Sequence, residues 1–372
     1  MSSLTPLSLQ LSVTNTSHPT TDAYFSSNNR LFLTLSKSKA MRSLFHKIRD
    51  SGSFGTISDA LIYLTSPLLL LSQGRRGISF ALNFPYISSL ALPLRYGVSH
   101  SSQVVDLFLS RTHSSRASFP PTEPCKNTLV TFVHGGAWGS GDKLMYRGVA
   151  ATFLERGFDV AIVGYRVFPV GDTWDQAEDV ARALACLEKW GNDNDRSWAK
   201  VCLSAHSSGG HISLLSTLLH STSFVTHLVL LSGVYALDVH WDYEARRGVG
   251  EVSPLKSAAG CTRDGMEAAS IRSHLDPAPE HFPRTLMYHG LHDLAVPFLQ
   301  TVQCAALLRE HGLSVETIHD GGDHFAPVLE MVFGGKEGGT LAAVLEFLER
   351  EGEGGGERGE EEETRFAVAS KL

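Results

Sequence analysis

Residues 199–211 read AKVCLSAHSSGGH, an apolar run followed at once by a polar turn with paired glycines. The apolar half is typical of a short buried strand, and apolar residues at helical spacing follow in residues 209–220. Ser207 lies between the two and has small residues, Ala205 and Gly209, two places away on either side. A tight strand-to-helix turn needs small residues there, because larger side chains would clash as the helix folds back on the strand. The stretch therefore predicts a strand, a sharp turn that exposes Ser207, and a helix.

A plainer interpretation of the same turn is a helix N-cap, in which the Ser207 hydroxyl caps a helix that begins one or two residues later. The neighbouring serines fit a nucleophile less well, since Ser204 has no glycine two places after it and Ser208 has His206 two places before it. The turn by itself leaves the nucleophile and the cap open, so partners elsewhere in the chain have to decide between them.

Strand-like and helix-like segments alternate along residues 96–350, and most of the strand-like segments are apolar on both faces. This pattern predicts an α/β fold with a mostly parallel central sheet and helices on both faces. The strand-like segments are residues 104–110, 128–133, 158–165, 199–205, 226–233, 284–290 and 313–320. The helix-like segments are residues 175–190, 209–220, 297–312 and 340–350.

Four regions lie outside this alternation. Residues 234–282 carry charges and glycines, and we expect them to form a cap insertion above the carboxyl edge of the sheet. Residues 51–95 hold two apolar stretches interrupted by prolines, each shorter than the roughly 20 residues of a membrane span, so we expect an apolar helical arm that packs on the main domain or rests on a membrane. Residues 1–50 are rich in Ser and Thr, residues 351–372 are rich in Gly and Glu, and both are expected to be disordered.

The composition narrows the possible partners. The chain has 372 residues, 42% of them hydrophobic, which is enough for one large core with extensions or for two smaller domains. Its net charge of -7 and the lack of a basic stripe argue against nucleic acid as a partner.

The five cysteines are scattered without a CxxC pair, which indicates reduced thiols in an intracellular compartment. His206 and His211 do not share a helical face, so we expect no metal site and no cofactor.

The residues after two later strands can supply the partners that a serine nucleophile requires. Such a serine needs a histidine as general base and a carboxylate that orients the imidazole. Asp293 follows the apolar strand of residues 284–290, and His324 lies in a Gly-rich loop after the next strand. In this type of sheet the catalytic residues follow strand ends in the order serine, acid, histidine. The order Ser207, Asp293, His324 therefore predicts a catalytic triad.

Other acids and histidines lie near the same strand ends. Asp323 is adjacent to His324 in sequence and is therefore poorly placed to grip its imidazole. His292 is adjacent to Asp293 and meets the same objection. The remaining rivals are Asp320, His289 and His319.

An oxyanion hole is expected in the glycine-rich loop that follows strand 128–133. Acyl transfer creates an oxyanion that preorganised backbone N–H groups stabilise, and glycine lets the backbone approach the substrate closely. We assign the donors to the N–H groups of Gly136, Ala137 and Ser208. Trp138 is expected either to line the acyl pocket or to have a purely structural role. The loop lacks the GxxxxGK[ST] spacing of a phosphate-binding loop.

Five motifs, in this order, resemble those of the α/β-hydrolase superfamily: HGGAWGSGDK, YRVFP, AHSSGGH, HGLHDLAVP and GGDHF. The pattern is most similar to the feruloyl-esterase-like branch, which includes isoprenylcysteine methylesterases and kynurenine formamidases. The resemblance spans about Tyr96 to Arg350 and departs from the family pattern at Ala205, where glycine is usual.

The resemblance implies an α/β-hydrolase fold and a hydrolase that cleaves a carboxylic ester or a small activated amide with Ser207, His324 and Asp293. It also implies Gly136, Ala137 and Ser208 as oxyanion donors. An arylformamidase-type amidase and a prenylcysteine methylesterase acting at a membrane surface remain open as alternatives. A ligand receptor on the same fold is a further alternative, against which the complete triad argues.

The chain ends in Ser370-Lys371-Leu372, which is a peroxisomal address read by an import receptor. Residues 1–50 carry six Lys/Arg and two acids, a composition that also suits an organelle transit peptide. We therefore expect a peroxisomal protein, with the cytoplasm, plastid and mitochondrion as alternatives.

Overall fold

The computed structural model describes residues 75–110, 126–220, 223–250, 253–333 and 338–350, with side chains from residue 82 onwards. The expectations for residues 1–50, for the first part of the apolar arm and for the C-terminal tail with its Ser370-Lys371-Leu372 address lie outside the described residues.

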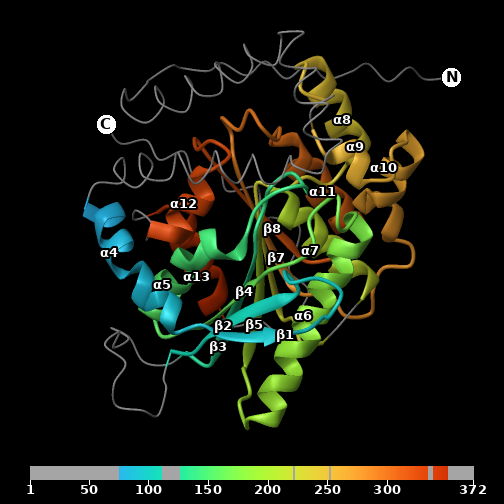
Figure 1. Ribbon diagram of the computed structural model, residues 1–372. Helices are drawn as coiled ribbons and strands as arrows, with labels where there is room; N and C mark the ends of the chain where they lie inside the picture. The colour runs from blue at the N-terminus through green and yellow to red at the C-terminus, as the bar shows by residue number, and fades with distance from the viewer. Residues whose placement is uncertain (1–74, 111–125, 221–222, 251–252, 334–337, 351–372) are drawn as a thin grey trace, which may run out of the picture.

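An eight-stranded sheet runs through the centre of the molecule in the order β1-β2-β4-β3-β5-β6-β7-β8 (Figure 1). The strands from β4 to β8 pair in parallel, and β2 is antiparallel to both of its neighbours, β1 and β4. The strands are β1 Leu92–Arg95, β2 Val104–Phe108, β3 Thr128–Val133, β4 Asp159–Val163, β5 Lys200–His206, β6 His227–Leu231, β7 Arg284–Gly290 and β8 Val315–Asp320.

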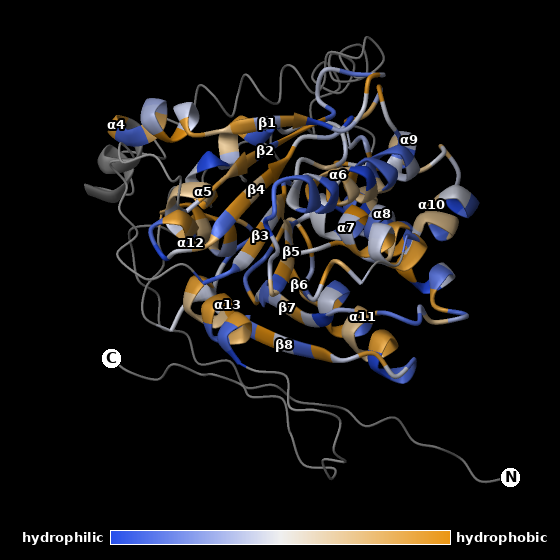
Figure 2. Cartoon of the chain, turned by 90° about the horizontal axis from the view of Figure 1, so that it is seen from below, coloured by the Kyte–Doolittle hydropathy of each residue, from blue (hydrophilic) through white to orange (hydrophobic). Residues whose placement is uncertain are grey.

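Helices cover both faces of this sheet (Figure 2). One face carries α6 Thr173–Asp193, α7 Ser208–Leu219 and α11 Leu299–Glu310. The other carries α4 Arg75–Ser89, α5 Arg147–Leu154, α12 Ala326–Phe333 and α13 Thr340–Glu349. The predicted fold class, a mostly parallel sheet with helices on both faces, is confirmed.

Alternate residues of the central strands enter two different apolar clusters. In β6, Leu228 and Leu230 pack in the cluster under α6 and α7, whereas Val229 and Leu231 pack in the cluster under α5 and α13. Successive side chains of a strand point to opposite faces, so a strand covered on both sides has to be apolar throughout. This explains the continuous apolar runs in the sequence.

The insertion expected at residues 234–282 folds as α8 Leu237–Arg246, α9 Leu255–Ala258, α10 Arg263–Ala269 and the 3₁₀ helix η2 Ile271–His274. These short helices lie together at one side of the molecule (Figure 1). The Tyr243 hydroxyl donates to the carbonyl of Leu294, and a Cβ built on Gly139 would meet Pro254 at 2.7 Å. The insertion therefore contacts both the loop after β7 and the loop after β3.

The start of the domain differs from the sequence expectation. Strand β1, Leu92–Arg95, joins the sheet before Tyr96, within the segment expected to be helical arm. It is an edge strand with mostly exposed residues and a proline, so it lacks the apolar pattern of the central strands. Helix α4 continues through Pro85, and its Ile87 is buried in the core. Helices α5 and α12 and the 3₁₀ helix η1 Lys143–Tyr146 were also not expected.

None of the helices in the described part of the chain is long and apolar enough to cross a membrane.

Candidate active site

Ser207 lies at the turn between β5 and α7, with backbone angles φ 55° and ψ -126°. A positive φ is strained for a residue other than glycine and persists only where the surroundings enforce it. The turn is tight because α7 passes close to β3: a Cβ at Gly209 would lie 2.4 Å from the carbonyl oxygen of His134. Ala205 is fully buried in the sheet, paired with Val133, and its extra methyl group leaves the strand register intact.

The Ser207 hydroxyl faces an imidazole instead of capping the helix. Ser207 occupies the N-cap position of α7, but its side chain makes no capping hydrogen bond. Its Oγ lies 3.0 Å from Nε2 of His324. The geometry therefore excludes the plain N-cap interpretation of the turn.

Asp293 completes a hydrogen-bonded chain with these two residues. It lies in the loop after β7, and its Oδ2 is 2.7 Å from Nδ1 of His324, which lies in the loop after β8. Both the Asp293 and His324 side chains are buried. The structure thus brings Ser207, His324 and Asp293 together at the carboxyl ends of three parallel strands, where ligands bind in folds of this kind.

Four donors surround the Asp293 carboxylate. Its Oδ1 accepts from the backbone N–H groups of Ala295 and Val296, both at 2.8 Å, and its Oδ2 is also 3.1 Å from Nε2 of His289. Burial alone would raise the pKa of Asp293, but the charge of His324 and the hydrogen bonds from His289 and His324 outweigh it and hold that pKa below its usual value. The group is therefore ionised whenever His324 needs an orienting carboxylate.

The loop after β3 has an unusual backbone at the positions assigned to the oxyanion hole. Gly136, Ala137 and Trp138 all have positive φ, at 140°, 49° and 60°. A Cβ at Gly136 would lie 2.0 Å from the carbonyl oxygen of Ser140, so only glycine fits there. The N–H groups of Gly136 and Ala137 donate no hydrogen bond within the described residues. They are thus free to meet a ligand.

This loop lies directly beside Ser207, the candidate nucleophile. A Cβ at Gly135 would fall 2.9 Å from the Cβ of Ser207. Ser208 is the first residue of α7, and the first N–H groups of a helix have no partner within the helix. Unpaired N–H groups from the loop and from the helix N-terminus therefore flank the Ser207 hydroxyl, and such groups favour a developing negative charge.

The next loop, residues 164–171, holds the oxyanion loop in its strained conformation. The Tyr165 hydroxyl donates to the carbonyl of His134 at 2.8 Å. The Phe168 N–H and the Gln176 side-chain amide both donate to the carbonyl of Trp138, at 2.8 and 2.9 Å. These bonds fix the loop at both of its ends.

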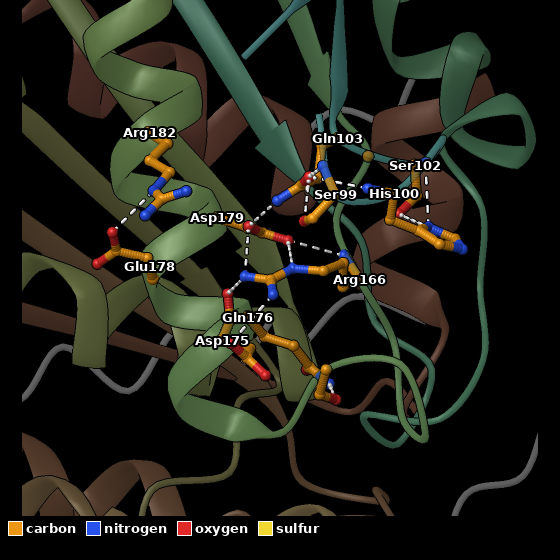
Figure 3. Close-up of polar contacts among 12 residues, drawn as sticks. Ser99, His100, Ser102, Gln103, Arg166, Asp175, Gln176, Glu178, Asp179 and Arg182 are labelled. Atoms are coloured by element: carbon orange, nitrogen blue, oxygen red, sulfur yellow. Dashed lines mark hydrogen bonds and ion pairs between the residues drawn. The ribbon is translucent and has the colours of Figure 1, made fainter. Parts of the chain in front are cut away.

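An ion pair between Arg166 and the buried Asp179 anchors the loop of residues 164–171 to α6 (Figure 3). Arg166 Nε and Nη2 donate to the two oxygens of Asp179, both at 2.9 Å, and the Arg166 backbone N–H adds a third bond. Gln103 donates to the same carboxylate at 2.8 Å. Asp179 is 0% exposed, and its hydrogen bonds raise the pKa of the Arg166 guanidinium. This cluster touches no reacting group and acts only through the loops.

Trp138 is 1% exposed and its indole Nε1 donates to Nδ1 of His211 at 3.1 Å. The other nitrogen of His211 lies 2.8 Å from the carbonyl of Ala269 in the insertion, so Nε2 carries the proton. Burial lowers the pKa of His211 to about 4, which keeps it neutral. These contacts favour the structural role of Trp138: it ties the oxyanion loop through His211 to the insertion.

Two histidines that sequence reasoning did not place in the site contact the catalytic chain. His206 Nε2 lies 2.9 Å from the carbonyl of His324, and the two rings are 4.8 Å apart. Burial and the neighbouring His324 lower the pKa of His206 to about 3. His289, weighed only as a rival base, contacts Asp293 instead. The sequence shows that His206 precedes Ser207 and that His289 ends a strand-like segment. It does not indicate which way either imidazole points.

The other acids and histidines considered as alternative triad members form hydrogen bonds with backbone groups near them. Asp323 accepts from the N–H groups of Phe325 and Ala326, and Asp320 accepts from that of Gly322. His292 is hydrogen-bonded to the carbonyl of Gly321. Within the described ranges, no group of three or more His, Cys, Asp or Glu side chains is arranged to hold a metal ion.

The sequence matches a protein-family model and several known proteins. Residues 118–237 match the protein-family model BD-FAE. A probable isoprenylcysteine α-carbonyl methylesterase of rice, Oryza sativa subsp. japonica, is 29% identical over 223 residues, covering 53% of this chain and 50% of that protein. A kynurenine formamidase of Drosophila melanogaster is 25% identical over 245 residues, covering 62% and 73%.

Solved structures show the same fold. Esterase B of Lactobacillus rhamnosis superposes with a TM-score of 0.56 at 17% identity, covering 77% of this chain and 94% of that one. A putative thioesterase from Silicibacter gives a TM-score of 0.52 at 19% identity, covering 73% and 91%.

Together, the sheet and these similarities show that the chain has the α/β-hydrolase fold. Within it, the sequence is similar to isoprenylcysteine methylesterases and kynurenine formamidases. The chain spans about half the length of the methylesterases that it matches.

Proposed function

We propose that this protein is a serine hydrolase that cleaves carboxylic esters through an acyl-enzyme intermediate. The observation that carries the proposal is the hydrogen-bonded chain from Ser207 through His324 to Asp293, with the serine on a strained turn. A capping or structural serine has no need of a buried imidazole and carboxylate behind it.

In the proposed cycle, Ser207 Oγ attacks the substrate carbonyl while His324 Nε2 takes its proton. Asp293 stabilises the imidazolium that forms, and the N–H groups of Gly136, Ala137 and Ser208 bind the oxyanion. His324 then gives the proton to the departing alcohol. Water repeats the sequence on the acyl-enzyme and releases the acid.

The test is hydrolysis of short p-nitrophenyl esters, together with labelling by a fluorophosphonate probe, which reacts with activated serines. Ser207→Ala should abolish labelling and lower kcat by about 10⁶-fold. The matched control is Ser204→Ala, which removes another buried hydroxyl three residues away on β5 and should leave both readouts unchanged. A Ser207→Ala variant that retains activity would show that another residue is the nucleophile. A wild-type protein that neither hydrolyses esters nor reacts with the probe would favour the ligand-receptor alternative.

The substrate alternatives follow from the names of the relatives, an isoprenylcysteine α-carbonyl methylesterase and a kynurenine formamidase. A substrate panel separates them: acetyl to long-chain p-nitrophenyl esters, a prenylcysteine methyl ester and N-formylkynurenine. A kcat/KM at least tenfold higher for the formamide than for every ester would replace the esterase proposal with an arylformamidase.

We also propose that Ser370-Lys371-Leu372 directs the protein to peroxisomes through the import receptor. Deleting these three residues from an N-terminally tagged protein should disperse a punctate signal. A pattern that follows residues 1–50 instead would support the transit-peptide alternative. Contact of residues 59–94 with a membrane surface is tested separately, by co-sedimentation with lipid vesicles.

A further inference from the structure

We propose that His289 is a positioning residue for this active site, donating a hydrogen bond to the same oxygen of Asp293 that accepts from His324. The proposal rests on the proposed function, in which Asp293 orients the general base. His289 lies at the end of β7, four residues before Asp293, and is 0% exposed.

The contacts of its ring determine where the proton lies. Nε2 is 3.1 Å from Oδ2 of Asp293 and 3.0 Å from the carbonyl oxygen of Val296. Both of these oxygens can only accept, so Nε2 must carry a hydrogen. Nδ1 is 2.7 Å from the hydroxyl of Thr301 on α11, which can donate. A proton on Nε2 therefore lies between the two acceptors, Val296 and Asp293, which share it, and the Thr301 hydroxyl can donate to the unprotonated Nδ1.

This arrangement saturates the carboxylate. Oδ1 of Asp293 accepts two backbone N–H groups, and Oδ2 accepts the N–H of His324 and shares the Nε2–H of His289 with the carbonyl of Val296. A carboxylate has about four lone-pair positions, so none is left for a proton or for rotation. The second imidazole thus holds Oδ2 in the position that His324 needs.

His289 also affects the basicity of His324. A donor on Oδ2 shares the negative charge of Asp293, so the carboxylate stabilises the imidazolium of His324 less than it would alone. The other titratable groups that face His289 are His206, from the serine turn, and His319, its partner in β8. Burial is the main cause that lowers the pKa of both, so neither adds a charge near neutral pH.

The experiment compares His289→Phe, which keeps a ring without a donor, with His289→Gln, which keeps a side-chain N–H. Two readouts are used: the pKa of His324 from NMR titration of ¹⁵N-histidine-labelled protein, and the pH profile of kcat/KM for p-nitrophenyl acetate. In His289→Phe we expect the acidic limb of the kcat/KM profile to move to higher pH, because Asp293 has lost a hydrogen-bond donor. We expect kcat to fall about 10- to 100-fold with little change in KM, since the base is less well oriented.

His289→Gln should restore most of kcat and the wild-type pH profile, which a purely structural role would not require. The matched control is His227→Phe, which removes another buried imidazole at the opposite end of the neighbouring strand β6 and should leave the pKa of His324 unchanged. Unaltered kcat and pH profile in His289→Phe would overturn the proposal. So would the same loss of kcat in His289→Gln as in His289→Phe.

The tautomer can be read in the wild-type protein without any variant. Two-bond ¹⁵N–¹H couplings should show His289 protonated at Nε2 and unprotonated at Nδ1, and an Nδ1–H tautomer would overturn the proposal. Neither NMR measurement needs a substrate, so a protein that hydrolyses nothing but shows this tautomer and the shifted His324 pKa would refute the proposed function and leave the role of His289 intact.

Discussion

Two buried carboxylates in this molecule each have four hydrogen-bonding contacts but different kinds of partner. Asp293 is held by two backbone N–H groups and two imidazoles. Asp179 is held by a guanidinium, an amide and one backbone N–H (Figure 3). An imidazole can gain and lose a proton near neutral pH, whereas a guanidinium remains charged. The partners, more than burial, therefore make one carboxylate suited to catalysis and the other to anchoring a loop.

The largest expected effect is the fall in kcat when Asp293, the candidate catalytic carboxylate, is replaced. Asp293→Asn should lower kcat for p-nitrophenyl esters by about 10⁴-fold, because the amide favours the wrong tautomer of His324. Binding depends little on this residue, so KM should stay close to the wild-type value. Steady-state kinetics checks the prediction, and circular dichroism checks that the variant is folded. A loss of less than tenfold would mean that Asp293 does not orient the base.

At the anchoring carboxylate we expect the effect to appear in stability. Asp179→Ala leaves Arg166 without its buried partner and should lower the free energy of unfolding by about 3 kcal/mol, measured by urea denaturation. The folded Asp179→Ala variant should keep the wild-type pH profile of kcat/KM, including its acidic limb. A matched control is Arg182→Ala, which breaks an exposed pair with Glu178 on the same helix and should change stability by only about 0.4 kcal/mol. Equal losses in the two variants would contradict the distinction between them.

An effect that is smaller for each residue and pH unit comes from the buried histidines around the site. The pKa of His206 is lowered to about 3 and that of His211 to about 4, both mainly by burial, whereas an unfolded histidine titrates near pH 6.5. Above pH 6.5 both states are neutral and stability is unaffected. As the pH falls below 6.5 the unfolded chain takes up protons that the folded one does not, so the free energy of unfolding falls by about 1.4 kcal/mol per histidine and pH unit.

Urea denaturation between pH 7 and 5 measures this slope. In His211→Gln, whose new side chain does not titrate, the free energy of unfolding should fall less steeply with pH. The difference is the contribution of one histidine, about 1.4 kcal/mol per pH unit. The Asp293 carboxylate acts in a lower range: its lowered pKa stabilises the folded state above the pKa of an unfolded Asp, near 3.9, and that contribution disappears below it. A flat profile between pH 7 and 5 would show that the buried histidines are already protonated in the folded protein.

Local patterns of residue type predict the fold class and the chain order of the candidate site. Apolar runs such as residues 128–133 predict strands covered on both faces because they have no polar side to turn to water. The small residues around Ser207 predict a tight turn on steric grounds. These are local properties, so they can be read from neighbouring residues without knowledge of distant contacts.

The contacts of the polar residues become clear only when distant parts of the chain are packed together. Ser207 caps nothing because the turn aims its hydroxyl at His324, more than a hundred residues away in sequence. Trp138 is buried against His211, and His289 contacts the acid instead of acting as a base. The edge strand β1 was not predicted, because its residues lack the apolar pattern of a buried strand. It is a strand because it pairs with β2. A hydrogen bond depends on angles and on distances of about 3 Å between side chains, and residue types along the chain do not encode these until distant strands pack together.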